Sequence, residues 1–446
     1  MSLAAVAIGV PTVKAVLGRR VRPGFIAVEV PVLLLLLSTL VFRERSADEL
    51  AYNPLDAAAQ FRVLCVALAL VLGAVALISR PHATPSNGRL TSLPIRLYLL
   101  YVFVVFLGAP VSIDLPLTAY RGVELITGLI VMVGARRSVG DEAGERIGTV
   151  LYWFHVGLLL SVWIGFILSP DEVMYRILNS NSPLGWQIQG IWPSISSNGV
   201  GALGVLVTFW SLARLRILPT PTSLQRGLGY VMAGLAVATL IFAQYRTGYV
   251  AFVAGLLVYL LFGKKWVFAS LVVMVVLGAI AVGPSSLIGD AEPFALRGQT
   301  TEQASKLSSR VDFWRASIPV WEESPLIGRG LLTATRFEVL APLGLPYTSG
   351  IHSTWVEALV GTGLIGLTLL SLSFLITFKR AFARALWSGD LLPVLLLTVL
   401  AVRSITGSTF ETFSYQAMIF LWLALALSDD EQQRLESVPS TGRPEP

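Results

Sequence analysis

Long apolar segments recur along almost the whole chain and leave little sequence for a water-soluble core. Windows of about 17 to 25 mostly apolar residues follow one another, the length that a helix needs to cross roughly 30 Å of hydrocarbon. Hydrophobic residues make up 54% of the chain and charged residues 13%, whereas soluble domains carry about 25% charged residues. We therefore expect an all-α polytopic membrane protein, with residues 1–446 forming a single transmembrane domain.

The apolar windows predict about twelve transmembrane helices. They lie at roughly 24–42, 57–79, 94–113, 117–134, 147–169, 198–213, 227–244, 248–262, 266–288, 354–378, 391–408 and 411–428. Basic residues gather in alternate connections, such as Lys264–Lys265, whereas connection 43–56 is net acidic. Because positive loops stay inside, we expect both termini in the cytoplasm and the connection Asp290–Ser353 outside. This orientation also accounts for the net charge of +6 without nucleic acid as a partner.

The connection 290–353 is far longer than the others, and loops longer than about 15 residues are usually functional or disordered. Ser309 and Asp312 form a capping pair, which predicts that a helix begins there. Its apolar face would hold Phe313, Trp314, Ser317, Val320 and Trp321. We expect this connection to be an ordered lid of short helices that carries the catalytic region. The polar residues 429–446 are expected to form a disordered cytoplasmic tail.

His352 precedes a predicted helix, because Thr354 and Glu357 form a T-x-x-E box. A helix N-terminus presents unpaired N–H groups and a partial positive charge. That setting would keep the imidazole neutral, able to accept a proton, and would attract phosphate. A polar residue at the membrane interface is an equally good interpretation of His352 on position alone.

Two arginines stand out because they lie near hydrocarbon. Arg246 lies in a very short turn between two predicted spans and has no acidic residue within four positions, and Arg310 begins the predicted lid helix. Arginine at such depth is costly unless it is paired or functional, and a guanidinium binds phosphate oxygens in pairs. Asp312 leaves a local ion pair open for Arg310. Weaker candidates are Arg121, Arg62 and Arg403, which could instead reach the interface, bind headgroups or pair with carboxylates such as Glu124 or Glu411.

Several motifs are missing from the chain. There is no P-loop and no G-x-S-x-G element, so neither an ATP-driven pump nor that class of hydrolase is indicated. No external D-x-D pair and no H-E-x-x-H cluster suggests a metal site, and we expect neither metal nor cofactor. A secondary transporter stays open as an alternative, although such proteins favour carboxylates near the bilayer midplane and the predicted spans contain few.

The run SSRVDFWRASIPVWEESPLIGRG, followed by IHSTWVEALVGTGLIGL, resembles the signature of the O-antigen ligase and polymerase superfamily. The matching elements are R-x-x-x-W, P-x-x-G-x-G, and a His-Asn or His-Ser pair followed by G-x-x-G. In this chain they are Arg310 with Trp314, Pro325 with Gly328 and Gly330, and His352-Ser353 with Gly363 and Gly366. An earlier element, Asn198 and then Tyr245-Arg246-Thr247-Gly248, is also similar. The resemblance covers about residues 185–370 with motifs, and Ser353 departs from the commoner Asn.

The resemblance implies a GT-C-like, inverting and metal-independent glycosyltransferase in the bacterial cytoplasmic (inner) membrane. It would move a glycan from undecaprenyl diphosphate to an acceptor hydroxyl on a glycan or a lipid-anchored molecule, with membrane lipids around it. A polymerase that joins carrier-linked repeat units is the alternative, and one sequence does not separate the two. The implied catalytic residues are His352, Arg310 and Arg246. Substrate binding would involve Arg121, Asn198, Trp314, Arg329, Ser353 and Glu357.

Overall fold

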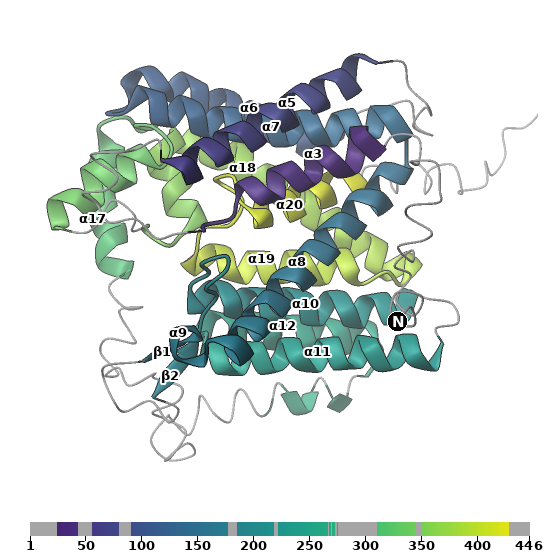
Figure 1. Cartoon of the computed structure of the whole chain (residues 1–446). Helices are drawn as coiled ribbons and strands as arrows, with labels where there is room; N and C mark the ends of the chain where they lie inside the picture. Colours follow the sequence, from purple (N-terminus) through teal and green to yellow (C-terminus); the bar gives the residue numbers. More distant parts are fainter. Residues whose placement is uncertain are drawn as a thin grey trace, which may run out of the picture.

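The computed structural model describes residues 25–42, 56–79, 91–176, 185–217, 222–265, 310–344 and 350–427, with isolated positions between 267 and 274. Helices dominate these residues (Figure 1). The helices of the first half are α3 (Phe25–Ser38), α5 (Ala57–Ile78), α6 (Leu93–Gly108), η1 (Ala109–Val111), α7 (Leu115–Val139), α8 (Glu142–Leu168), α9 (Pro170–Val173) and α10 (Ser197–Ile217). Those of the second half are α11 (Ser223–Ala243), α12 (Arg246–Phe262), α17 (Arg310–Glu322), η2 (Ala334–Leu340), η3 (Ala341–Leu343), α18 (Thr354–Ser388), α19 (Leu392–Thr406) and α20 (Tyr415–Ala426).

Each predicted span coincides with one of these helices except 266–288, which lies almost wholly outside the described residues. Seven helices of the described part are long and apolar enough to cross a membrane, and four shorter apolar helices accompany them. The tail 429–446 and the start of the long connection, 290–309, also lie outside the described residues. The all-α polytopic membrane protein is thus confirmed in outline, and the count of twelve spans stays a prediction.

The helices form two groups that α8 and α18–α20 join. In the upper part of Figure 1, α5 packs between α3 and α7, and α6 packs on α18. In the lower part, α10 contacts α11 and α19, and α12 contacts α19. α8 crosses obliquely from one group to the other, and α18 contacts α19. The short segments before and after α19 therefore run from one group of helices to the other.

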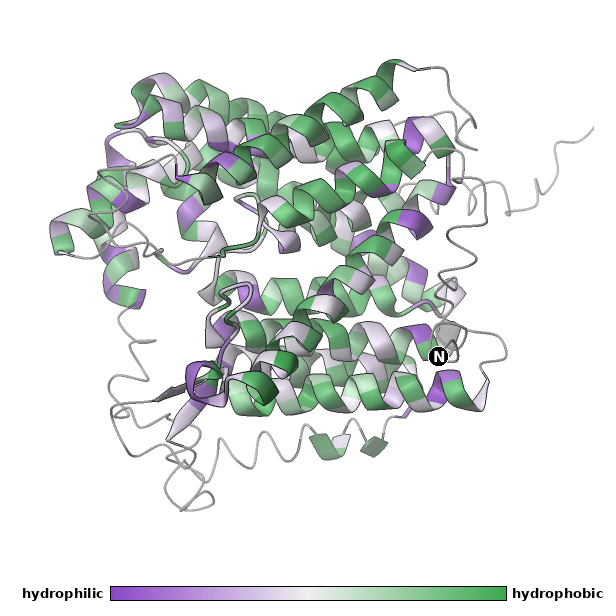
Figure 2. Cartoon of the chain, viewed as in Figure 1, coloured by the Kyte–Doolittle hydropathy of each residue, from purple (hydrophilic) through white to green (hydrophobic). Residues whose placement is uncertain are grey.

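Helix surfaces show which sides face lipid. Leu64, Leu68, Val71 and Val75 recur at helical spacing along α5 and are all exposed, as expected of a stripe in contact with hydrocarbon. Figure 2 shows apolar residues along the lengths of the helices and polar residues near their ends. Inside the bundle small residues allow close approach, because a β-carbon on Gly134 would touch the backbone of Gly73 on α5. The chain is an integral membrane protein.

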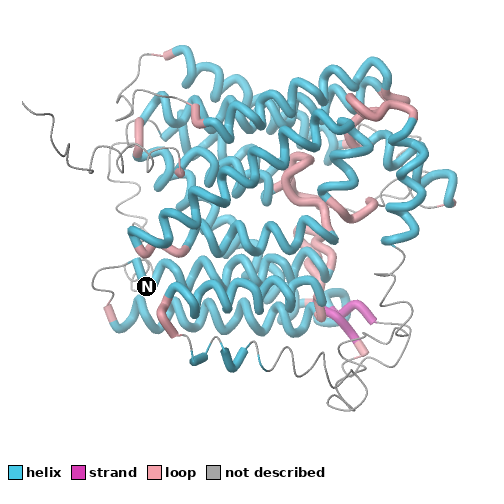
Figure 3. The backbone as a smooth tube through the Cα atoms, turned by 180° about the vertical axis from the view of Figure 1, so that it is seen from behind, coloured by secondary structure: helices cyan, strands magenta, loops and turns pink. Residues whose placement is uncertain are grey.

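One end of the bundle carries most of the structure outside the long helices. Helix α17, the short segments η2 and η3, and a small hairpin lie there, at the left of Figure 1; the same loops appear from behind in Figure 3. The hairpin pairs β1 (Met174–Arg176) with β2 (Trp186–Ile188) in antiparallel register, with Tyr175 opposite Gln187. We call this end the α17 end. The helix predicted near Ser309 is confirmed as α17, and its role as part of a lid stays a prediction.

Candidate functional site

Helix α17 is fixed to the segment that contains His352. The indole N–H of Trp314 donates to the carbonyl of Ile351 over 3.0 Å. Val320 packs in an apolar cluster with Ile351 and with residues of η2 and α18, and Phe313 and Trp321 pack against that cluster. Arg310 lies one helical turn before Trp314 and on the same face. The R-x-x-x-W motif therefore positions a guanidinium beside His352.

His352 has an unusual backbone conformation. Its φ is +52°, in the left-handed region that costs a residue with a β-carbon about 1 kcal/mol or more. Buried neighbours hold it there, since Ile351 accepts the Trp314 bond and Ser353 caps α18 by accepting from the Val356 N–H over 3.5 Å. The Thr354 hydroxyl donates to the Gly407 carbonyl over 3.1 Å. Strained backbone conformations of this kind concentrate at functional sites.

Three arginines from three different helices gather near His352, two of them acting on it directly and the third through its neighbour Arg310. Arg246 is the first residue of α12, Arg310 the first of α17, and Arg403 lies in the last turn of α19. The charge of Arg310 reaches Arg246, Arg403 and His352. We refer to Arg246, Arg310, His352 and Arg403 as the His352 cluster. Because its fixed charges are all positive, the cluster favours a bound anion with several oxygens.

Arg403 is the most firmly held member of the cluster. Its Nε donates to Gln416 Oε1 over 3.0 Å, and its Nη1 donates to the Tyr245 hydroxyl over 3.1 Å. A longer contact of 3.4 Å joins Nη1 to the Asn198 carbonyl. The guanidinium thus ties α19 to α20 and to the turn before α12. Its hydrogen bonds go to these groups and not to Glu411, the partner suggested by the sequence.

Burial and the neighbouring arginines keep the imidazole of His352 neutral. Burial of the segment, and then the charges of Arg310 and Arg403, lower its pKa to about 4. The side chain is nevertheless exposed at the surface of the described residues, so solvent or a substrate can reach it. Burial first, and the charge of Arg403 among the further causes, also lower the pKa of Arg310. A neutral imidazole beside several guanidinium groups can accept a proton while they bind an anion.

The glycine motifs join α18 to the loop that follows α17. Helix α18 is broken at Gly363, where φ is +64° and ψ is −169°. The loop 325–330 fills the break: Arg329 and Gly330 donate their N–H groups to the Val360 and Gly361 carbonyls over 3.0 and 3.1 Å. Leu364 in turn donates to the Pro325 carbonyl over 2.8 Å. P-x-x-G-x-G and G-x-x-G are therefore two halves of one backbone junction, which satisfies the opened helix.

The remaining predicted site residues have other partners. Ser353 is the cap of α18, Trp314 holds the His352 segment, and the Asn198 backbone accepts from Arg403. Glu357 is buried and accepts from the Leu332 N–H over 2.9 Å and from the Thr335 hydroxyl. The predicted T-x-x-E box is wrong, because Ser353 takes the capping position and Glu357 turns toward η2. Arg329 pairs with Glu338 over 3.1 Å, and Arg121 with Glu124 over 2.6 Å.

The sequence underestimated Arg403, gave Tyr245 no role beyond its place in a motif, and did not indicate Gln416. Tyr245 and Gln416 both bind Arg403 of the His352 cluster, and Arg403 also lies over the Tyr245 ring at 5.7 Å from its centroid. A signal for Tyr245 was present, since it directly precedes Arg246 in the short turn. Arg403 comes long after the motifs, and only the packing of α19 on α12 brings it to them.

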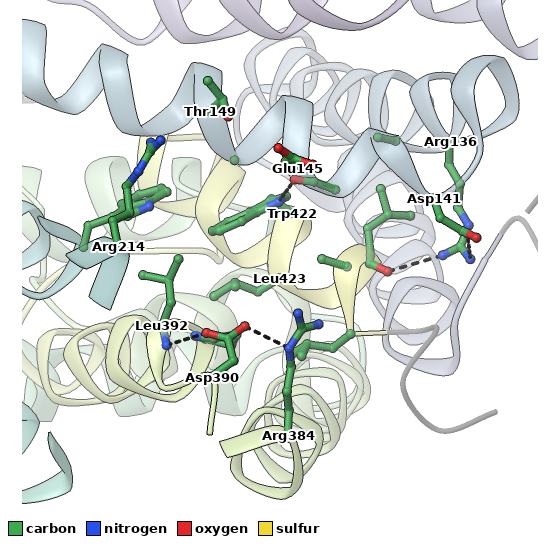
Figure 4. A pocket seen from close by; sticks show the side chains of 18 of the residues that line it. Arg136, Asp141, Glu145, Thr149, Arg214, Arg384, Asp390, Leu392, Trp422 and Leu423 are labelled. Atoms are coloured by element: carbon green, nitrogen blue, oxygen red, sulfur yellow. Dashed lines mark hydrogen bonds and ion pairs between the residues drawn. The ribbon is translucent and has the colours of Figure 1, made fainter. Parts of the chain in front are cut away.

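A cavity of about 590 Å³ lies at the opposite end of the bundle, between α7, α8 and the ends of α18–α20. Figure 4 shows its ion pairs, Arg136 with Asp141 and Arg384 with Asp390. Arg384 Nε and Asp390 Oδ2 are 2.9 Å apart. None of the site residues predicted from the sequence lines this cavity. Its paired charges make it a weaker candidate for an anionic substrate than the α17 end.

Comparison with known proteins agrees with the motifs. Residues 231–371 match the family model described as O-antigen ligase. No curated protein matches the chain. The matched range contains Arg246, Arg310 and His352, whereas Arg403 lies beyond it. This match, over about a third of the chain, supports the resemblance to the O-antigen ligase and polymerase superfamily.

Proposed function

We propose that this protein is an inverting membrane glycosyltransferase that moves a glycan from undecaprenyl diphosphate to an acceptor hydroxyl. The observation that carries the proposal is the His352 cluster: the charges of Arg310 and Arg403 act on one neutral, exposed imidazole, and Arg246 adds a third guanidinium near Arg310. The family match over residues 231–371 supports the general class of reaction. The diphosphate is already a good leaving group, so the reaction needs no nucleotide.

The reaction is a single displacement. The acceptor hydroxyl gives its proton to the imidazole of His352 while its oxygen attacks the anomeric carbon. The bond between that carbon and the diphosphate oxygen breaks, and the electron pair leaves with the diphosphate. Arg246, Arg310 and Arg403 would bind the diphosphate oxygens and stabilise the charge that develops there. One displacement inverts the configuration of the anomeric carbon.

The proposal includes an orientation in the bacterial cytoplasmic membrane, with the α17 end outside and both chain termini in the cytoplasm. It rests on the alternation of basic and acidic connections in the sequence. Two single cysteines in a Cys65→Ser background test it: Asp312→Cys, exposed on α17, and Ser388→Cys, exposed at the opposite end. In intact cells an impermeant thiol reagent should label only Asp312→Cys. Labelling of only Ser388→Cys would reverse the orientation.

Product analysis tests the function. The purified protein in nanodiscs receives a carrier-linked glycan alone, or together with a lipid-anchored acceptor, in buffer with and without chelator. A product of acceptor plus glycan supports a ligase, and elongated carrier-linked glycan without added acceptor supports a polymerase. Transfer should survive the chelator. If wild-type protein forms neither product, yet carries a solute across a liposome membrane, the glycosyltransferase proposal is wrong.

A further inference from the structure

A second group of arginines lies at the α17 end, away from His352. Glu124 on α7 is fully buried and pairs with two of them: Arg62 Nε is 3.0 Å and Arg121 Nη1 2.6 Å from its carboxylate oxygens. The charges of Arg62 and Arg121 also reach Arg336 of η2. We refer to Arg62, Arg121 and Arg336 as the Arg336 cluster. Its three cations face two carboxylates, Glu124 in ion pairs and Glu357 at longer range, so at least one positive charge is left over.

Arg336 is the member of the cluster that has no ion pair among the described residues. Within the same residues its Nε is buried without a hydrogen-bond partner, as is the Nε of Arg121. Burial first, and then the charge of Arg121, lower the pKa of Arg336 to about 10. Buried donors without acceptors are costly. An anion with two or more oxygens would satisfy both Nε groups and relieve the repulsion.

The local fold holds Arg336 in this position. η2 is a π-helix, a rare conformation that is frequent at functional sites. Glu357 fixes the segment before it, by accepting from the Leu332 N–H and the Thr335 hydroxyl over 2.9 Å. The cluster is also open on one side, because the Arg62 side chain is 29% exposed and that of Arg121 12%. A ligand can therefore approach along α5.

Both clusters lie near the beginning of α18. The charge of Glu357, one turn into that helix, reaches both Arg336 and Glu411. The charge of Glu411 in turn reaches Arg403 of the His352 cluster. A glycosyl transfer needs two substrates side by side, and the His352 cluster accounts for only the donor diphosphate. The Arg336 cluster is a separate site for negative charge on the same face of the bundle.

We infer that the Arg336 cluster binds an anionic group, a phosphate or a carboxylate, carried by the acceptor. This inference rests on the proposed function and adds a chemical class of acceptor to it. With the acceptor anion on Arg336 and Arg121, its hydroxyl would lie toward His352. Membrane phospholipids carry the same phosphate chemistry, and the experiment must separate the two sources.

Arg336→Gln is the informative variant, because it removes no ion pair from a buried carboxylate. Variants of Arg62 or Arg121 would each remove an ion-pair partner of Glu124. The matched control is Arg315→Gln, which removes one exposed guanidinium from α17. Rates are measured with two acceptors that differ only in one phosphate or carboxylate. We expect Arg336→Gln to raise the KM for the anionic acceptor about 10-fold or more, as for a lost charged hydrogen bond. The KM for the neutral acceptor and for the donor should not change, and Arg315→Gln should resemble wild type.

A binding measurement separates failure of this inference from failure of the proposed function. In an Arg310→Ala background, which weakens the His352 cluster, inorganic phosphate should raise the unfolding temperature. Addition of Arg336→Gln should abolish that increase even if no glycan is ever transferred. Equal KM values for both acceptors in Arg336→Gln, or an unchanged phosphate effect, would overturn the inference. So would an anionic phospholipid that copurifies with wild type and is absent from Arg336→Gln, since the site would then belong to the bilayer.

Discussion

Arg403→Lys tests whether Arg403 belongs to the catalytic site or merely anchors a helix. Lysine keeps the charge but cannot donate to Gln416 and Tyr245 at once, as the guanidinium does over 3.0 and 3.1 Å. The 3.4 Å contact to Asn198 is too long to contribute much. The variant therefore loses about one charged hydrogen bond, worth about 1.5–3 kcal/mol. If the transition state needs this geometry, kcat/KM falls about 10- to 100-fold.

The assay measures initial rates of transfer from carrier-linked donor by purified protein in nanodiscs. Arg384→Lys is the matched control, because Arg384 also makes a short side-chain bond, to Asp390 over 2.9 Å, but at the opposite end of the bundle. Each variant loses a side-chain hydrogen bond of the folded protein, so both should lower the unfolding temperature by a similar amount, and only Arg403→Lys should also lower kcat/KM. A kcat/KM for Arg403→Lys within twofold of wild type, beside a large loss for Arg246→Lys, would refute the reasoning and leave Arg403 as a structural residue.

Four further outcomes are expected. His352→Ala should stay folded and lose about 10²–10⁴ in rate, as for a missing general base; near-normal transfer would remove His352 from the mechanism. Arg246→Lys and Arg310→Lys should weaken donor binding nearly as much as alanine does, because lysine lacks the paired donors; free replacement by lysine would contradict this. Gly363→Ala should lower the unfolding temperature, since φ there is +64° and the β-carbon would overlap the inserted loop, whereas Gly157→Ala, with open space around it, should not. Finally, kcat/KM should fall as pH drops through about 4, where His352 becomes protonated in the free enzyme. The midpoint for kcat should be higher, because bound diphosphate offsets the arginine charges; identical midpoints would argue against that coupling.

Much of the fold could be predicted because membrane helices are recognisable in a sequence by their length and apolar composition. The predicted spans 57–79 and 248–262 differ from α5 and α12 by two residues or fewer at either end. The span predicted to end at 378 is too short, because α18 continues to Ser388. The prediction ended there because the basic residues Lys379, Arg380 and Arg384 suggested a loop. A helix can continue at this depth because the long side chains of lysine and arginine let their charges reach water.

The site was only partly predictable, for a physical reason. Motifs such as R-x-x-x-W report a local geometry, and they identified Arg310 and His352. Arg403 and Gln416 reach the same place from α19 and α20, and nothing near them in sequence indicates what α19 packs against. Glu357 looked like a capping residue because its spacing from Thr354 fits the pattern, yet buried Thr335 and the Leu332 N–H offer its carboxylate better partners.

The arrangement of the His352 cluster also explains why α17 needs its apolar anchor. Arg310 on α17 faces like charges on α12 and α19, so electrostatic repulsion opposes the packing of this helix on the bundle. The Trp314 bond to Ile351 and the burial of Val320 hold α17 in place against that repulsion. A diphosphate between the arginines would turn this electrostatic repulsion between the helices into attraction, because its oxygens can bind guanidinium groups of all three helices together. The same anion would raise the pKa of His352 from about 4 toward its ordinary value. Donor binding would thus make the imidazole a stronger base at the moment when an acceptor proton has to be removed.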